Sequence, residues 1–276
     1  MSRVLIMSSW TSVGHVGLSA ATPVLQALGH HVTQLPTIIL SNHRGWRHVA
    51  GRPIPAREIL EMVDAIDANG WLDGHDTFLA GYMPSAEHVA VACKIADRLR
   101  RRPTVPRVVV DPILGDDPRG LYVDRDVADA VRDTLVPQAD VLTPNAFELG
   151  WLTDRPTRTL TETHDAAMAL AEGSLDREIL VTSPPLPADE TGILALGRNG
   201  ETLFRTPRLD DLPNGAGDVF SALIAAGLPV GAALGHLQAL IEASAGAGHL
   251  DIVGSSERWK RAAAIAGGPL MHLIGA

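Results

Sequence analysis

The segment Pro213-Asn214-Gly215-Ala216-Gly217-Asp218 places two glycines and a carboxylate directly before an apolar run typical of a helix. The first N–H groups of a helix have no partner within the helix, and the helix dipole is positive there. The backbone of Gly215, Ala216 and Gly217 therefore predicts an anion site that a phosphate could approach closely. Asp218 would be placed to take a proton from a hydroxyl group beside that phosphate. The segment indicates phosphoryl transfer, with an ordinary glycine-rich helix start as the alternative.

Two other segments bring carboxylates to the ends of predicted strands. In VVVDPILGD, Asp111 ends a β-branched run typical of a buried parallel strand, and Asp116 follows on a turn. In LTPNAFELGWL, Asn145 and Glu148 are three residues apart and would share one face of a helix. Because Mg2+ prefers oxygen ligands, these groups could hold the ion or its waters. The structural alternatives are an Asp-Pro strand end and a capping box formed by Asn145 and Glu148.

A third strand end carries hydroxyl groups instead of carboxylates. The run ILVTS ends in Thr182 and Ser183. These side chains would lie near a nucleotide if the strand joins the same sheet, or would form a plain polar turn.

Strand-like and helical patterns alternate along most of the chain and would position these residues. Runs typical of strands lie at 4–9, 76–82, 107–112 and 177–183, with helical patterns between them. This alternation predicts an α/β fold with a mostly parallel central sheet flanked by helices on both faces, whose active site lies at the carboxyl ends of the strands. Residues 191–207 predict a small antiparallel hairpin. The closing part, 217–266, is predicted to be helical, and residues 1–276 to form a single domain.

Composition excludes several classes of partner. The 276 residues carry a net charge of -9, which argues against a nucleic-acid-binding surface. The one cysteine, Cys93, permits no internal disulfide, and no apolar run is long enough for a membrane span, so a cytoplasmic location is expected. Residues 1–57 contain five arginines and no acidic residue. That stretch either attracts an anionic ligand such as a nucleotide or forms a solvated edge.

Taken in order, these segments resemble the ribokinase-like superfamily of small-molecule kinases, and within it the pyridoxal kinases. GAGD at 215–218 and TPN-x-x-E at 143–148 resemble motifs found across the superfamily, and DPILGD at 111–116 resembles its D-P-V-[ML]-G-D. GHVG at 14–17, SNH at 41–43 and GY at 81–82 resemble the narrower pyridoxal kinase pattern. Arg44 stands where that pattern has threonine, and it could fold over the site, meet the phosphates or point to solvent.

The resemblance implies a role for each candidate residue. Asp218 would be the base for a 5'-hydroxymethyl group, and Gly215, Ala216 and Gly217 would form the anion hole. Asp111 and Glu148 would organise Mg2+ through water. ATP would be bound by Asp116, Tyr122, Asn145, Thr182 and Ser183. The pyridine ring would be contacted by Ser9, Val16, His43 and Tyr82, with Ile38 and Leu40 as apolar walls.

The activity implied is ATP-dependent phosphorylation of pyridoxal to pyridoxal 5'-phosphate, with ATP and Mg2+ required and a monovalent cation such as K+ left open. The resemblance also implies a homodimer. A hydroxymethylpyrimidine kinase, another small-molecule kinase of the superfamily and a non-catalytic vitamin-binding protein are the alternatives. A nicotinamide-binding loop at 14–17 is excluded, because no acidic residue precedes Glu58 to bind the ribose.

Overall fold

The computed structural model describes residues 1–172 and 176–270, and its centre is a ten-stranded sheet. The strand order is β12-β11-β10-β9-β8-β5-β4-β1-β2-β3, and neighbouring strands from β9 to β2 all run parallel. The strands of this sheet are β1 (Arg3–Thr11), β2 (His31–Leu40), β3 (Gly51–Pro53), β4 (Thr77–Ala80), β5 (Arg107–Val110), β8 (Val141–Leu142), β9 (Glu178–Thr182), β10 (Glu190–Gly197), β11 (Gly200–Pro207) and β12 (Gly267–Pro269). This architecture confirms the predicted α/β fold.

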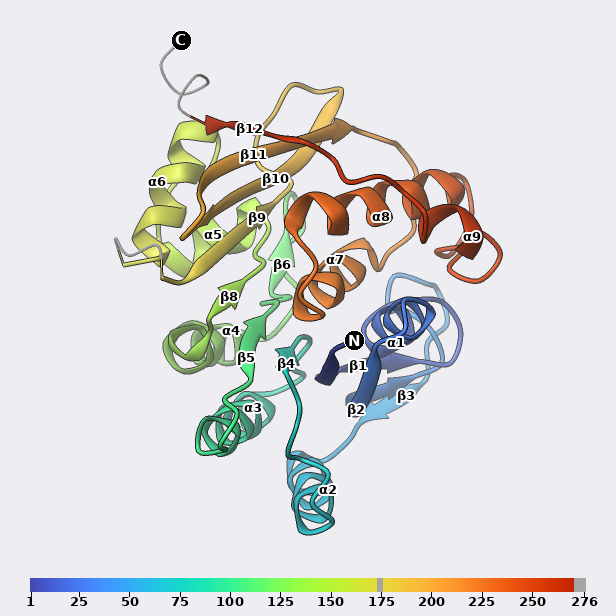
Figure 1. Ribbon diagram of the computed structural model, residues 1–276, viewed down its shortest axis with the longest axis vertical. Helices are drawn as coiled ribbons and strands as arrows, with labels where there is room; N and C mark the ends of the chain where they lie inside the picture. The colour runs from blue at the N-terminus through green and yellow to red at the C-terminus, as the bar shows by residue number, and fades with distance from the viewer. Residues whose placement is uncertain (173–175, 271–276) are drawn as a thin grey trace.

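Helices cover both faces of the sheet (Figure 1). One face packs against α1 (Leu18–Ala27), α7 (Ala216–Ala225), α8 (Val230–Ala243) and α9 (Ser256–Trp259). The other packs against α2 (Ala56–Ala68), α3 (Ala86–Arg100), α4 (Arg125–Ala130), α5 (Ala146–Thr153) and α6 (Leu160–Leu170), with a π turn (Val131–Leu135) and a 3-10 turn (Val136–Gln138) continuing α4. A small separate sheet joins β6 (Gly115–Asp116) to β7 (Gly120–Leu121).

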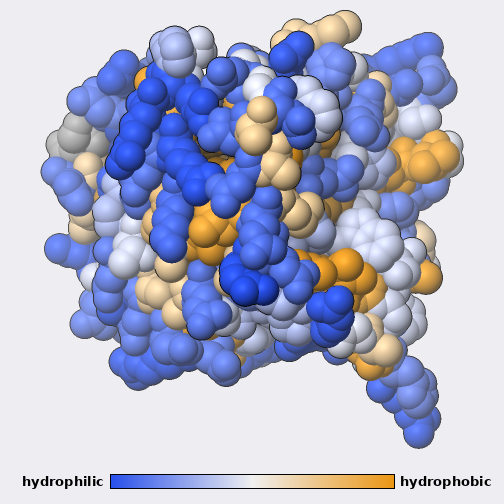
Figure 2. All heavy atoms as spheres, turned by 90° about the horizontal axis from the view of Figure 1, so that it is seen from below, coloured by the Kyte–Doolittle hydropathy of each residue, from blue (hydrophilic) through white to orange (hydrophobic). Residues whose placement is uncertain are grey.

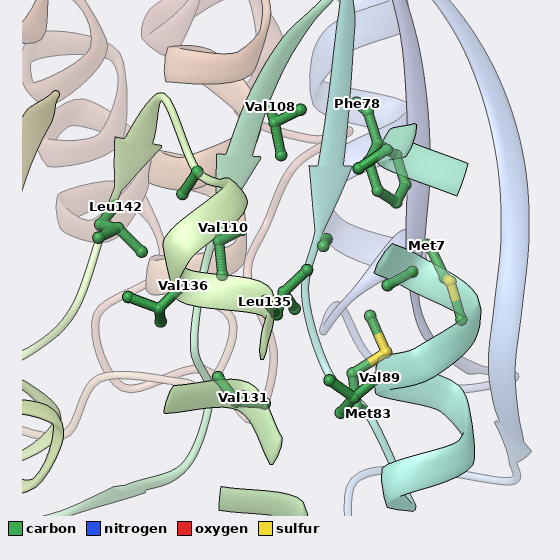
Figure 3. Packing of buried hydrophobic residues seen from close by; sticks show 14 of the residues in the cluster. Met7, Phe78, Met83, Val89, Val108, Val110, Val131, Leu135, Val136 and Leu142 are labelled. Carbon is green, nitrogen blue, oxygen red and sulfur yellow. The ribbon is translucent and has the colours of Figure 1, made fainter. Parts of the chain in front are cut away.

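The two cores follow from the alternation of side chains along the strands. Val108 and Val110 of β5 belong to the core on the α2–α6 face, whereas Val109 between them belongs to the core on the α1, α7 and α8 face. Figure 3 shows Val110 near Leu135 and Val136. Since all three valines are fully buried, this strand holds its carboxyl end, and hence Asp111, in a rigid position.

The face of the molecule shown in Figure 2 is mostly hydrophilic, and its apolar side chains are visible as separate patches. Over the described residues, no helix has both the length and the apolar character that a membrane crossing requires.

The predicted hairpin is confirmed, since Gly197 pairs with Gly200 across its turn, and its strands β10 and β11 extend the main sheet. The predicted helical end is confirmed for α7, α8 and α9, but it is wrong for residues 244–255, which form turns and bends between α8 and α9, and for the chain beyond Trp259, where α9 ends. Residues 260–266 follow without a helix, and Ile265 donates a backbone hydrogen bond to Gly231 of α8. A Cβ at Gly231 or Gly235 would lie 2.3 or 2.1 Å from a backbone oxygen of this segment. Close packing on glycines of α8 thus overrides the helix propensity of the alanines.

The start of α3 is held by a side-chain contact in place of a cap. Ser85 occupies the N-cap position, but its hydroxyl makes no capping hydrogen bond. The hydroxyl lies 2.8 Å from Nδ1 of His88 instead, and Nε2 of that histidine meets the Ile54 carbonyl at the same distance. The serine therefore anchors α3 to the segment before α2 through a buried histidine.

Candidate active site

At the N-terminus of α7, the space around Gly217 is open, whereas Gly215 is packed against other parts of the protein. Gly215 is the N-cap, with φ of 107° and a Cβ position 1.9 Å from the carbonyl oxygen of His15. The protein's own packing therefore requires glycine there. At Gly217, an added Cβ would meet no atom within 4 Å. Its missing side chain leaves room for an anion to reach the first-turn N–H groups.

Asp218 lies in the first turn of α7 and faces the same open space. Burial raises the pKa of this carboxyl to about 6, although a hydrogen bond from the Gly17 backbone opposes the shift. A carboxylate with this pKa is largely ionised at neutral pH and is a better proton acceptor than an exposed aspartate.

Asp111 follows β5 and is tied to α7 by hydroxyl groups. The Ser221 hydroxyl donates to Oδ2 of Asp111 at 2.7 Å, and the Thr143 hydroxyl lies 2.9 Å from that of Ser221. Burial, together with the nearby carboxylates of Glu148 and Asp218, raises the pKa of Asp111 well above its usual range. Like charges in a low-dielectric site resist full ionisation unless a cation joins them.

Glu148 confirms the structural alternative drawn from its spacing with Asn145. The two residues form the capping box of α5, with Asn145 Oδ1 accepting from the Glu148 N–H and Glu148 Oε2 accepting from the Asn145 N–H. Glu148 Oε1 accepts in turn from the N–H of Leu114 at 2.8 Å. Ile113 makes this contact possible by turning the chain with φ of 46°, a rare conformation for a β-branched residue. Burial raises the pKa of Glu148 to about 7 despite these hydrogen bonds.

These groups line one cavity of about 450 Å³ at the carboxyl ends of the parallel strands. Among the residues predicted from the sequence, those lining it are Ser9, Val16, Ile38, Leu40, His43, Tyr82, Asp111, Asp116, Tyr122, Asn145, Glu148, Thr182, Gly215, Gly217 and Asp218. Ala216 and Ser183 are not among its lining residues. Ser183 adopts φ of 50° and donates its N–H to the Gly192 carbonyl, directed toward the hairpin strand β10.

Several lining residues were not assigned to the site by sequence reasoning. They are Thr11, Arg44, Gly45, Ile113, Arg119, Thr143 and Asn214. Thr143 and Asn214 adjoin the predicted motifs, so their position in the chain was an available signal. Arg119 lies in the turn between β6 and β7, where no periodic pattern marks it.

Two surface segments close over the cavity. The lid loop, residues 41–50, joins β2 to β3, and the flap, residues 115–121, contains β6 and β7. Within the lid loop, Nδ1 of His43 accepts the Gly45 N–H at 3.1 Å, which leaves Nε2 to carry the proton of the neutral ring. Burial, and then the charge of Arg119 in the flap, lower the pKa of His43. The tips of the two segments are therefore close to each other.

The donor set fits a hydrated divalent cation better than a closed metal centre. Over the described part of the chain, no group of three His, Cys, Asp or Glu side chains converges on one point. Oδ1 of Asp116 is nevertheless buried without a hydrogen-bond partner in the flap, close to the buried Glu148 carboxylate. Mg2+ commonly uses one or two carboxylates, several waters and substrate phosphates, and this arrangement suits that pattern.

Comparisons with known proteins identify the family of this chain. The phosphomethylpyrimidine kinase family model matches residues 13–245. Pyridoxal kinase PdxY from Corynebacterium diphtheriae is 35% identical over 80% of this chain and 79% of its own length. The pyridoxine/pyridoxal/pyridoxamine kinase from Bordetella avium is 37% identical over 84% and 79%. The structure of Leishmania donovani pyridoxal kinase in complex with ADP and pyridoxamine has a TM-score of 0.85 at 28% identity, covering 98% of this chain and all of that one. The chain therefore belongs to the pyridoxal kinase family of the ribokinase-like fold.

Proposed function

We propose that this protein transfers the γ-phosphoryl group of ATP to the 5'-hydroxyl of pyridoxal or a related B6 vitamer. The observation that carries the proposal is the convergence of Asp218 and the open α7 N-terminus with buried carboxylates in one cavity. A base, an anion hole and a site for a divalent cation are the parts that phosphoryl transfer requires. The B6 kinase names of the relatives, and the ADP and pyridoxamine in the solved structure, support ATP and a B6 vitamer as the substrates.

Asp218 accepts the proton of the 5'-hydroxyl as its oxygen forms a bond to the γ-phosphorus. The bond from that phosphorus to the β,γ-bridging oxygen breaks, and ADP leaves with the electron pair. The N–H groups at the start of α7, exposed at Gly217, donate to the equatorial oxygens and stabilise their charge. Because the donors are fixed by the helix, little reorganisation is needed as the phosphoryl group moves.

Mg2+ fits beside Asp111 and Glu148, with Asp116 and its unpartnered Oδ1 in the flap as a further oxygen. The ion would supply positive charge that neutralises the triphosphate. The protein's part is to hold Asp111 through Ser221 and Glu148 through the backbone of residues 114 and 115. A need for K+ also remains a prediction.

The remaining lining residues suit the two substrates. Asn145, Thr182 and Tyr122 lie on the side of the cavity formed by α5, β9 and the flap, where polar side chains can bind the nucleotide. Ser9, His43 and Tyr82 combine polar groups with the apolar walls of Val16 and Ile38, as expected for a substituted pyridine. Ser183 does not line the cavity, so we propose that it contacts ATP only after the cavity closes around the nucleotide.

The test is ATP consumption by the purified protein with Mg2+ on pyridoxal, pyridoxine, pyridoxamine, hydroxymethylpyrimidine and ribose. We expect kcat/KM for at least one B6 vitamer to exceed that for the pyrimidine by tenfold or more. Turnover of the pyrimidine or ribose in place of every B6 vitamer would reject the substrate assignment and retain the kinase. The pyrimidine belongs in the panel because the matching family model is that of phosphomethylpyrimidine kinases.

The proposal extends to assembly and location. We propose that residues 1–276 form one kinase domain that acts as a homodimer in the cytoplasm. Exposed apolar side chains at the ends of β1 and β2 and in the lid loop support a contact with a second copy, and they are Trp10, Val13, Ile39 and Val49. Sedimentation equilibrium at micromolar protein checks the dimer, and a monomer mass would reject it.

A further inference from the structure

Arg44 is a cation of the cavity wall that the proposed mechanism leaves unused. It lines the cavity together with Asp218 and Gly217, although its backbone belongs to the lid loop. Among the described residues, its guanidinium has no ion-pair or side-chain hydrogen-bond partner. All five of its N–H donors are therefore available to a ligand.

The lid loop that carries Arg44 is held by its own hydrogen bonds. The Ser41 N–H donates to the Ala50 carbonyl at 2.7 Å, and the Ala50 N–H donates to the Ser41 hydroxyl at 2.9 Å. The Asn42 amide donates to the carbonyls of His43 and His48. These bonds close the base of the loop and span its tip, so Arg44 is presented from an ordered support.

Charge is distributed unevenly around the cavity. The carboxylates of Asp111, Glu148 and Asp218 lie at the ends of strands or in helices beneath it, whereas the chain from residue 1 to 57 carries no acid. Arg44 in the lid loop and Arg119 at the tip of the flap supply positive charge to the same cavity wall. Arg119 is already within 4.0 Å of the Asp116 carboxylate, which leaves Arg44 as the cation with no protein partner in the described cavity wall.

We propose that Arg44 donates hydrogen bonds to the phosphoryl group during its transfer and then to the phosphate of the product. A planar guanidinium matches two oxygens of a phosphate at once, which a hydroxyl or an ammonium does not. Arg44 would act from the lid loop, in the same cavity as the N–H groups of α7. This inference rests on the proposed function, since it names the group in that reaction which Arg44 contacts.

The test compares Arg44→Ala, Arg44→Lys and the matched control Arg47→Ala, an exposed arginine of the same loop that does not line the cavity. Turnover is measured for each, and pyridoxal and pyridoxal 5'-phosphate are titrated separately into each protein. We expect Arg44→Ala to lower kcat about tenfold or more and to weaken pyridoxal 5'-phosphate binding to a similar extent, the scale of a lost charged hydrogen bond. The affinity of Arg44→Ala for pyridoxal should change less than threefold. Arg44→Lys should have kcat and pyridoxal 5'-phosphate affinity between those of the wild type and Arg44→Ala, and Arg47→Ala should match the wild type.

Three outcomes would overturn this role. Arg44→Ala could keep kcat and phosphate-ester affinity within twofold of the wild type. Arg47→Ala could lower turnover equally, which would indicate general attraction of anions. Pyridoxal and its phosphate could lose affinity together, which would place Arg44 on the ring. If the wild type instead phosphorylates another compound in the panel, the comparison is made with that compound and its phosphate ester, so the two proposals fail separately.

Discussion

The strand-end cluster (Asp111, Glu148 and Asp218) and the lid loop line the same cavity, but different forces hold them. Asp111 and Glu148 are almost fully buried, and each receives hydrogen bonds from a distant part of the chain. The lid loop is exposed beyond its first three residues and is braced mostly by bonds within itself. The cluster is therefore built for fixed chemistry at some cost in stability, while the lid loop can adjust to a substrate at little cost.

Replacement of Asp218 should give the largest effect. Asp218→Ala and Asp218→Asn should each lower kcat on the order of 10²-fold or more, the scale of a lost positioned base, with substrate binding largely retained. Steady-state kinetics and a pyridoxal titration check this. Turnover near that of the wild type would remove Asp218 from the mechanism.

The same substitution should stabilise the fold. In the folded protein the pKa of Asp218 is raised to about 6, above that of an aspartate in the unfolded chain. The folded state therefore loses stability as the pH rises from the unfolded-state pKa through 6, and the whole destabilisation is present at pH 8. Asp218→Asn should therefore raise Tm at pH 8 by about 2 °C or more, and less at pH 4. An unchanged Tm at pH 8 would contradict the burial cost assigned to this site.

The two glycines of α7 provide the next test, with an expected effect on the order of 10- to 100-fold. Gly217→Ala should lower kcat/KM by that amount because the methyl group occupies the space for the phosphate, while Tm stays the same or rises with helix propensity. Gly215→Ala should lower Tm instead, since φ of 107° and the His15 carbonyl both exclude a Cβ. Thermal unfolding and kinetics on both variants separate the roles, and equal Tm losses would refute the distinction.

These contrasts also explain which features the sequence could predict. Asp111, Glu148 and Asp218 were found because short motifs join a residue type to a strand end or a helix start. Ser221 was missed, since its contact with Asp111 joins residues 110 apart and nothing in the helix pattern marks a buried hydroxyl. The end of α9 was misjudged because packing of residues 260–266 on glycines of α8 is a tertiary effect. For Arg44, the neighbouring motif residues were recognisable, but the direction of its side chain depends on the fold of the lid loop.

The pH profile should show about a tenfold effect at pH 5. Asp218 must be ionised to accept a proton, and burial raises its pKa to about 6, so kcat/KM should fall about tenfold per pH unit below that value. The residual activity of Asp218→Asn should not show this fall in kcat/KM below about pH 6. A wild-type profile that stays flat down to pH 5 would show that the ionisation of Asp218 near pH 6 does not govern the reaction.

The smallest effect is expected in the lid loop, at Trp46. Its ring lies 5.7 Å from that of His249, so it links the loop to the segment after α8, yet 52% of its surface is exposed. Trp46→Ala should raise KM for pyridoxal about threefold and leave kcat and Tm nearly unchanged, because an exposed contact contributes little to folding but limits the loop's movement. Trp71→Ala, at 68% exposure and outside the cavity lining, is the control and should behave as the wild type. A large fall in Tm for Trp46→Ala would mean that the lid loop is part of the rigid fold. The lid loop and the strand-end cluster would then differ in solvent exposure but not in rigidity.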